Sequence, residues 1–305
     1  MYQAFIKQHR LSDDFIDLAK THFVPLAKDI IARQSEITIK NSTAHNKASP
    51  FFVGVNGCQG SGKSTLSDFI CHYIEHMTDL KVIVLSLDDF YFSQQKRSQL
   101  AEQVHPLLKT RGVPGTHDAA QMHDIFDQLT QSSGSIALPR FNKATDNPFP
   151  CEQWPLIDLP VDIVIFEGWC WGVSAQTEQQ LITPINTLEQ QFDQDAQWRT
   201  YVNQALINDY LPLYEVMDFW VLLKAPSFDC VYQWRLEQEN KLREKSDNND
   251  NSGVMSEQQV LQFIQYYQRL TEHGLTTMIA SCDRVFYLDE KRQIEKTTHK
   301  KQNLK

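Results

Sequence analysis

Hydrophobic residues cluster into five short runs along the chain, and each run has the length of a buried β-strand. Segments with apolar residues three and four positions apart separate these runs, which is the spacing of an amphipathic helix. Strands that alternate with helices predict a mostly parallel sheet with helices on both faces. We therefore expect a three-layer α/β/α protein with a five-stranded sheet and helical additions. The predicted strands are residues 51–55, 81–87, 161–166, 219–223 and 284–288.

Helical signals account for most of the chain between the strands. Ser12 is a suitable N-cap for a helix over residues 12–34, and Pro25 is expected to break this helix in two. Residues 174–215 have apolar positions at helical spacing and no ionisable cluster, so we interpret them as inserted helices that pack on the core. Ser227 begins a long helix, and a capping box at Ser256 begins another.

A phosphate-binding loop follows the first strand. Residues 57–64 match the pattern G-x-x-x-x-G-K-[ST] at every fixed position and lead into a helix-like segment. Its glycines let backbone N–H groups and the positive end of the helix point at nucleotide phosphates. We expect Lys63 to reach the β- and γ-phosphates and Ser64 to bind Mg²⁺. The predicted nucleotide contacts are Gly57, Gln59, Gly60, Ser61, Gly62, Lys63, Ser64 and Thr65.

Acidic residues follow the second and third predicted strands. Asp88 and Asp89 follow the second strand, and Glu167 follows the third. Ligands of open α/β sheets lie outside the carboxyl ends of the strands, so these acids are expected to face the γ-phosphate. Either Asp88 or Asp89 is a candidate general base for an alcohol acceptor, and Glu167 is the expected partner of Mg²⁺. The alternative is that the acids only cap the turns that follow them.

Basic residues in a loop and in a late helix are candidates for binding anionic groups. Arg111 lies beside glycines in residues 92–117, which we expect to be irregular, and it suits an acceptor carboxylate or phosphate unless it is merely solvated. His117 is a further ligand candidate, or it orients its loop. Arg235 and Arg243 are eight residues apart, so both point across the phosphates if their helix closes as a lid. The alternative is one lid arginine and one surface arginine.

Charge and cysteine content narrow the classes of function. A formal net charge of −9 over 305 residues argues against broad nucleic-acid binding, so an anionic ligand must meet a local basic pocket. The six cysteines contain no C-x-x-C pair, so neither a zinc site nor a disulfide framework is indicated. We see no signal peptide and no apolar run long enough to span a membrane. We therefore expect a cytoplasmic protein, while its oligomeric state stays open.

Several stretches together resemble the D-glycerate 3-kinase-like P-loop kinases, which belong to the group of uridine kinase, phosphoribulokinase and bacterial pantothenate kinase. The P-loop and the Asp-Phe-Tyr stretch are shared across the group, whereas the Arg-Gly…His-Asp, Pro-Arg-Phe-Asn-Lys and Glu-Gly-Trp stretches resemble the glycerate kinase relatives. The resemblance implies a P-loop NTPase fold, ATP and Mg²⁺ as donor and cofactor, and a small anionic alcohol as substrate. The matching stretches are residues 57–65, 86–91, 111–112 with 115–118, 138–143, 166–169 and 232–236.

The resemblance also implies roles for single residues. It makes Asp88 the base and Asp89 a magnesium candidate, and it makes Arg111, Arg140 and Lys143 candidates for the glycerate carboxylate. Lys63 and Arg235 are expected to act in catalysis, Arg243 to contact the nucleotide and His117 to contact the substrate.

The domain organisation expected on this basis is one kinase domain with appendages. Residues 1–50 are expected to form a helical appendage and its connection, residues 51–290 the P-loop kinase domain, and residues 291–305 a basic tail. Within the kinase domain, residues 174–215 are a helical insertion and residues 227–253 a lid region.

The leading hypothesis is an ATP-dependent kinase that phosphorylates a primary hydroxyl, with D-glycerate as substrate and 3-phosphoglycerate as product. The alternative is a uridine- or pantothenate-type kinase. A less favoured alternative is an NTP-hydrolysing switch or assembly factor, which needs no acceptor-binding cations and usually carries a base-reading motif. Residues 142–146 superficially match the N-K-x-D base reader, but they contain one residue too many and do not follow a buried strand.

Overall fold

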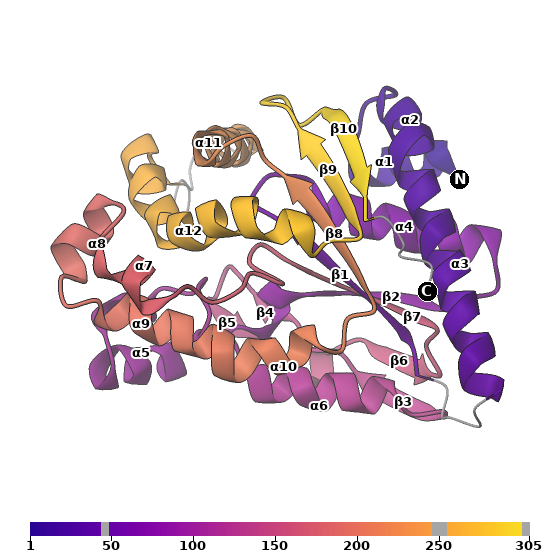
Figure 1. The fold of residues 1–305 in the computed structure, drawn as a ribbon, viewed down its shortest axis with the longest axis horizontal. Coiled ribbons are helices and arrows are strands. Elements are labelled where there is room, and N and C mark those ends of the chain that lie inside the picture. Colours follow the sequence, from indigo (N-terminus) through magenta and orange to yellow (C-terminus); the bar gives the residue numbers. More distant parts are fainter. Residues whose placement is uncertain (44–48, 246–254, 301–305) are drawn as a thin grey trace.

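A six-stranded sheet forms the centre of the protein in the computed structural model, which describes residues 1–43, 49–245 and 255–300. The strand order is β10-β9-β8-β1-β7-β2 (Figure 1). Neighbouring strands from β9 to β2 are parallel, whereas β10 is antiparallel to β9. The predicted α/β fold is therefore confirmed. The strands are β1 Phe51–Gly57, β2 Val82–Ser86, β7 Ile163–Gly168, β8 Phe219–Lys224, β9 Arg284–Leu288 and β10 Ile294–His299.

The prediction of five strands in this sheet is wrong, because β10 lies in the stretch expected to be a basic tail. Residues Ile294–His299 pair with β9 and close one edge of the sheet. After Ile294 they carry only polar or charged side chains, as is usual for an edge strand with an exposed face, so they lack the apolar run that marked the other five. Residues 301–305 of the predicted tail lie outside the described residues.

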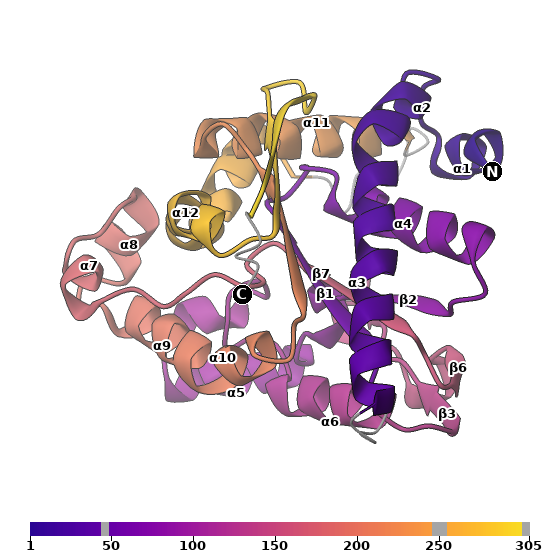
Figure 2. The ribbon, with the colours of Figure 1, turned by 45° about the vertical axis from the view of Figure 1, so that its right-hand side comes forward.

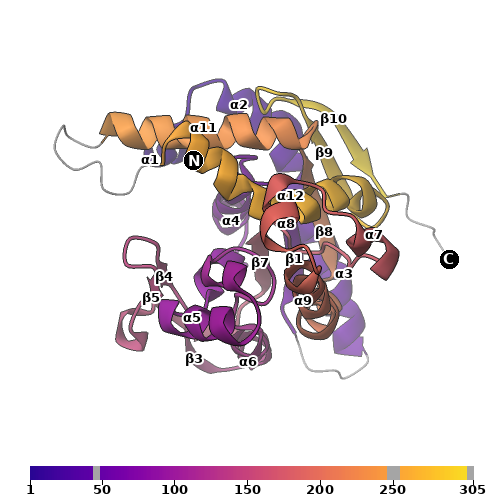
Figure 3. The same cartoon turned by 90° about the vertical axis from the view of Figure 1, so that its left-hand side faces the viewer.

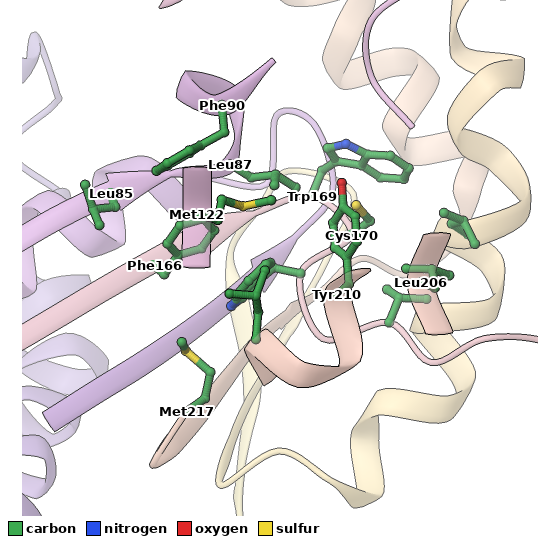
Figure 4. Close-up of a cluster of buried hydrophobic side chains, with 14 of the residues drawn as sticks. Leu85, Leu87, Phe90, Met122, Phe166, Trp169, Cys170, Leu206, Tyr210 and Met217 are labelled. Carbon is green, nitrogen blue, oxygen red and sulfur yellow. The ribbon is translucent and has the colours of Figure 1, made fainter. Parts of the chain in front are cut away.

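Alternate residues of the strands belong to two hydrophobic clusters, one on each face of the sheet. Val53 and Val55 of β1 face a cluster with α1–α4 and α11, while Phe52 faces a cluster with α6, α9, α10 and α12. Figure 2 shows α3 lying beside α4 on the first face, and Figure 4 shows part of the second cluster around Phe166. The helices are α1 Tyr2–His9, α2 Phe15–Leu18, α3 Val24–Thr43, α4 Lys63–Met77, α6 Ala119–Leu129, α9 Gln197–Ala205, α10 Leu211–Tyr214, α11 Phe228–Lys245 and α12 Glu257–Thr277.

Pro25 was predicted to break the first long helix, and this prediction is wrong. Residues Ala19–Phe23 form a π turn between α2 and α3, and Pro25 is the second residue of α3. The same arrangement recurs where a π turn at Leu206–Tyr210 precedes α10, with Pro212 as its second residue. Because proline lacks an N–H and its ring crowds the preceding turn, a local widening of the helix lets the chain continue past it.

A polar helix lies in the stretch that was expected to be irregular. Residues Gln94–Gln103 form α5, which has almost no apolar residues. Its anchor is Arg97, whose side chain is 1% exposed and donates to the carbonyl oxygens of Phe92, at 3.1 Å, and Lys109, at 2.8 Å. It also pairs with Asp146 at 2.6 Å. The buried guanidinium of Arg97 thus anchors α5, which lacks the apolar face by which a helix is usually predicted.

The helical insertion at 174–215 contains a buried ionic cluster, so the expectation of no ionisable cluster there is wrong. Arg199 of α9 pairs with Asp193 at 2.8 Å, and Glu189 of α8 pairs with Arg269 of α12 at 2.6 Å. These four side chains are nearly or fully buried. The Glu189–Arg269 pair fastens α12 to the insertion, whose shorter helices are α7 Glu178–Ile182 and α8 Thr187–Phe192.

Two small antiparallel pairs of strands extend from the side of the sheet that ends in β2. The strands β3 Gly134–Ala137 and β6 Leu156–Leu159 form one pair, and β4 Phe141–Asn142 and β5 Asn147–Pro148 form the other. Figure 3 shows β4 and β5 beside α5, and Gln94 of α5 bonds Asn147 of β5 at 3.0 Å. Among the described helices, none is both long and apolar enough to cross a membrane.

Candidate active site

The P-loop turns between β1 and α4 beneath the helix α11. Gly60 and Gly62 have φ angles of +80° and +93°, which side-chain-bearing residues rarely adopt. A Cβ atom on Gly60 would lie only 2.7 Å from the Cβ atom of Trp234 of α11. Gly57 is the last residue of β1 and Lys63 the first of α4, so the predicted strand, loop and helix are all present. The glycine at position 60 is needed both for the turn and for the close passage of α11.

Glu167 is brought to the P-loop by the register of the sheet. It is the penultimate residue of β7, and its Oε1 accepts hydrogen bonds from Ser64 at 2.9 Å and from Ser86 of β2 at 3.0 Å. Lys63 Nζ lies 3.6 Å from Glu167 Oε2, which is buried and has no hydrogen-bond partner among the described residues. An unpartnered carboxylate oxygen beside a serine hydroxyl is the ligand chemistry that Mg²⁺ prefers.

Lys63 lies between two carboxylates. Burial alone lowers the pKa of its ammonium, but Glu167 and Asp88 outweigh that effect and hold the pKa above its ordinary value. The lysine therefore stays charged next to the phosphate-binding loop.

Ser86 was not predicted as a site residue, although it belongs to a stretch that resembles the kinase family.

Asp88 and Asp89 follow β2 but point to different partners. Asp88 accepts hydrogen bonds from the Tyr91 hydroxyl at 2.9 Å and from Lys143 at 2.5 Å. Burial raises the pKa of the Asp88 carboxyl, but Lys143 and Lys63 outweigh burial and lower the pKa to about 2. Asp88 is therefore ionised at neutral pH, next to the charge of Lys63.

Both carboxylate oxygens of Asp89 accept hydrogen bonds from residues at the start of β4. Its Oδ2 pairs with Arg140 at 3.1 Å and its Oδ1 accepts from the Phe141 N–H at 3.2 Å. Burial raises the pKa of Asp89, and Arg140 opposes this rise only in part. The structure brings Ser64 and Glu167 together, whereas Asp89 contacts Arg140 and Phe141 at the start of β4. Magnesium binding by Asp89 therefore stays a prediction without a structural contact to support it.

Arg111 is held in the wall of the site. It pairs with Asp146, its guanidinium carbon lies 5.6 Å from the ring centre of Phe141, and its carbonyl oxygen accepts from the Tyr267 hydroxyl at 3.3 Å. The next residue, Gly112, has a φ of +147°, and a Cβ atom there would lie 2.4 Å from the Tyr267 hydroxyl. Helix α12 thus packs directly against this loop through Tyr267, a wall residue that was not predicted as a site residue.

His117 is a buried neutral histidine behind the acidic residues. Its ring stacks on Tyr91 with 4.4 Å between centroids, and its Nδ1 lies 2.6 Å from the Tyr210 hydroxyl. Burial lowers the pKa of His117 to about 3. The Tyr210 hydroxyl also has a backbone hydrogen bond with Gly115, so it joins His117 to the loop that contains Gly115. The Nε2 of His117 has no partner among the described residues.

Within the part of the chain that the structure describes, Arg235 contacts residues of α11 and α12 rather than the P-loop. Its guanidinium pairs with Glu239 one turn along α11, bonds Gln238 at 3.3 Å, and has its carbon 5.7 Å from the ring centre of Phe263. Helix α11 is in turn fixed to the β9–β10 turn, because Trp234 Nε1 donates to the Glu290 carbonyl at 2.7 Å. The side chain of Arg243 lies outside the described residues, so the predicted pair of lid arginines stays a prediction.

A cavity of about 390 Å³ adjoins the P-loop on the side of the N-terminal helices. Its walls come from the start of α4, the residues before and within α2, β8 and the β9–β10 turn. The lining is mostly apolar, with two basic residues at the β9–β10 turn. Residues that define it are Leu11, Phe15, Gly62, Thr65, Lys291 and Arg292.

Comparison with known proteins agrees with this arrangement. The model of the KAP family P-loop domain matches residues 29–128. The uncharacterised kinase mug58 of Schizosaccharomyces pombe is 30% identical over 227 residues, which cover 72% of this chain and 78% of that protein. The chloroplastic D-glycerate 3-kinase of Arabidopsis thaliana is 27% identical over 262 residues, which cover 79% of this chain and about half (52%) of that protein.

A solved structure shows the same fold. The D-glycerate 3-kinase of Cryptococcus neoformans superposes with a TM-score of 0.72 at 24% sequence identity, covering 91% of this chain and 98% of that structure. The fold, the P-loop with its acidic strand ends, and the related kinases lead to one conclusion: the chain belongs to the D-glycerate 3-kinase-like family of P-loop kinases and is a phosphotransferase with an alcohol group as acceptor.

Proposed function

We propose that the protein transfers the γ-phosphate of ATP to the 3-hydroxyl of D-glycerate and so forms 3-phosphoglycerate. The observation that carries this proposal is the position of Asp88. Its charge acts on Lys63 of the P-loop on one side, and it pairs with Lys143 of β4–β5 on the other. A phosphate-binding half and a cation-bearing half thus meet at one carboxylate, which is what transfer to an anionic alcohol requires.

The donor half suits ATP with Mg²⁺. The P-loop amides and Lys63 would bind the phosphates, and the cavity beside Gly62 and Thr65 would receive the nucleoside. Ser64 and Glu167 would hold the metal, since they supply a hydroxyl and an unpartnered carboxylate oxygen. When bound, Mg²⁺ offsets part of the phosphate charge.

The transfer itself asks little covalent chemistry of the protein. The 3-hydroxyl oxygen forms a bond to the γ-phosphorus while the bond from that phosphorus to the bridging oxygen of ADP breaks. Asp88 accepts the hydroxyl proton, and Lys63 stabilises charge on the phosphate oxygens. A carboxylate with a low pKa is sufficient as the base, because the proton leaves late in a loose transition state.

The acceptor half provides positive charge and a neutral donor for a hydroxy acid. Lys143 and Arg140 lie at the two aspartates, and Arg111 stands in the wall nearby. The uncharged His117 stacks on Tyr91, and its Nε2, which has no partner among the described residues, would supply the donor. The similarity to D-glycerate 3-kinases favours glycerate among the small hydroxy acids.

The test is ADP release from ATP and Mg²⁺ with one acceptor at a time. D-glycerate should stimulate release strongly, while L-glycerate, uridine, pantothenate and ribulose 5-phosphate should not. Chromatography should identify 3-phosphoglycerate as the product. Stimulation by uridine or pantothenate alone would reassign the acceptor, and ADP release that no acceptor increases would favour a nucleotide-hydrolysing switch.

A further inference from the structure

Each of the three cations expected to bind the acceptor is paired with a carboxylate of the protein. Arg111 pairs with Asp146, Arg140 with Asp89 at 3.1 Å, and Lys143 with Asp88 at 2.5 Å. An anionic acceptor therefore does not meet a free cation at any of these three described positions. It must either add to an existing pair or replace one partner.

Two of these pairs are part of the architecture of the site. Asp146 is shared with the buried Arg97, so the Arg111 pair belongs to the anchoring of α5 and the β4–β5 turn. Arg140 also donates to the carbonyl oxygen of Pro139 at 3.1 Å, and its partner Asp89 holds the Phe141 N–H. Replacing either pair would disturb several contacts at once.

The third pair, Lys143 with Asp88, differs because its cation is exposed and has no further contact that anchors it. The Lys143 side chain is 60% exposed, and its ammonium contacts only Asp88 among the described residues. Exposed ion pairs add little net stability, so this pair can be exchanged at small cost. Asp88, in contrast, has both carboxylate oxygens engaged, by Tyr91 and by Lys143. A bound ammonium weakens the attraction of that carboxylate for a hydroxyl proton.

We infer that Lys143 exchanges partners during the reaction: it rests on Asp88 until the anionic group of the acceptor takes it over, and this exchange frees Asp88 to receive the acceptor hydroxyl. The inference rests on the proposed function and deepens it, because it names the selected substrate class. That class is small hydroxy acids whose carboxylate lies close to the reacting hydroxyl. A neutral alcohol leaves Lys143 on Asp88, so the protein selects for anionic acceptors by releasing its base only to them.

The exchange is tested by comparing a charged acceptor with its neutral counterpart in wild type and in Lys143→Met. D-glycerate and glycerol form such a pair, because both offer a primary hydroxyl and only one has the carboxylate. In the variant we expect kcat/KM for D-glycerate to fall roughly 10- to 100-fold, the range for losing a charge-assisted hydrogen bond. With glycerol, kcat/KM should rise, because Asp88 is no longer occupied by Lys143. Lys28→Met, on the exposed side of α3, is the control and should change neither value.

Each outcome decides the inference. An equal fall with both acceptors would overturn it, since Lys143 would then act on the phosphate or support the hairpin, and an unchanged value for D-glycerate would overturn it as well. Lys143→Arg should restore part of the preference for the charged acceptor.

The proposed substrate can fail separately. If wild type does not use D-glycerate but uses L-glycerate, the same ratio is measured with L-glycerate and glycerol. A collapse of the ratio there would support the exchange while refuting D-glycerate as the substrate. Use of pantothenate, whose carboxylate lies far from its primary hydroxyl, would overturn both proposals. If wild type accepts only uncharged alcohols, both proposals are overturned.

Discussion

The proposed donor and acceptor halves of the active site are built in different ways. The donor half comes from one continuous loop and the ends of adjacent strands, whose contacts follow from sheet register: Ser86 of β2 lies opposite Glu167 of β7. The acceptor half is assembled from the β4–β5 hairpin, the Arg111 loop, π-turn residue Tyr210 and helix α12. A phosphate-binding half can therefore stay constant while the acceptor half is changed by altering segments outside the sheet.

The largest expected effect concerns the residue at which the halves meet. Asp88→Asn should lower kcat by roughly 10²- to 10⁴-fold, the usual contribution of a general base, because the amide cannot accept the hydroxyl proton. The affinity for ATP, measured by calorimetry, should change little. Asp195→Asn, at an exposed position of the insertion, is the matched control. Unchanged turnover would move the base to Asp89 or Glu167.

In the acceptor half, the buried His117 should make the free energy of unfolding depend on pH. Its pKa in the folded protein is lowered to about 3 from an ordinary 6.5, so the unfolded chain binds the proton first as the pH falls. The stabilisation is fully present above about pH 6.5 and is lost between there and about pH 3, amounting to roughly 3–5 kcal/mol of unfolding free energy. Denaturant unfolding at several pH values measures this loss. His117→Gln should remove most of the pH dependence in this window, and an equally steep dependence in the variant would assign it to other groups.

A smaller effect is expected for the donor half. Glu167→Gln should lower kcat/KM for ATP roughly 10- to 100-fold and raise the Mg²⁺ concentration needed for half-maximal activity, because a charged metal ligand becomes neutral. The KM for D-glycerate should move little. Glu152→Gln, at an exposed position, provides the control. A selective change in the glycerate KM would place Glu167 in the acceptor half instead.

The smallest effect should come from Tyr210, which acts through His117. Tyr210→Phe removes the hydroxyl 2.6 Å from Nδ1 and with it the hydrogen bond that orients the imidazole. We expect KM for D-glycerate to rise about 3- to 10-fold, as for one neutral hydrogen bond, while KM for ATP stays the same. Tyr2→Phe removes a hydroxyl from α1 and serves as control. Equal changes in both KM values would indicate a general loss of structure.

Much of the fold was predictable because buried strands carry an obvious signal. The five apolar runs all became strands, whereas β10 was missed because an edge strand carries polar side chains. Helix α5 was missed for a related reason, since Arg97 anchors it by hydrogen bonds to carbonyl oxygens rather than by an apolar face. The buried Glu189–Arg269 pair was missed because its members are 80 residues apart.

The amino-acid sequence by itself determined the donor half of this protein, since the P-loop is a local motif and strand ends in a parallel sheet meet at one edge. Only the tertiary structure decided the acceptor half. It paired Lys143 with Asp88, Arg140 with Asp89 and Arg111 with Asp146, and it buried His117, whose pKa is thereby lowered. The physical reason is that a charged residue acts according to its partner and its exposure to water, and these depend on which distant segments fold together.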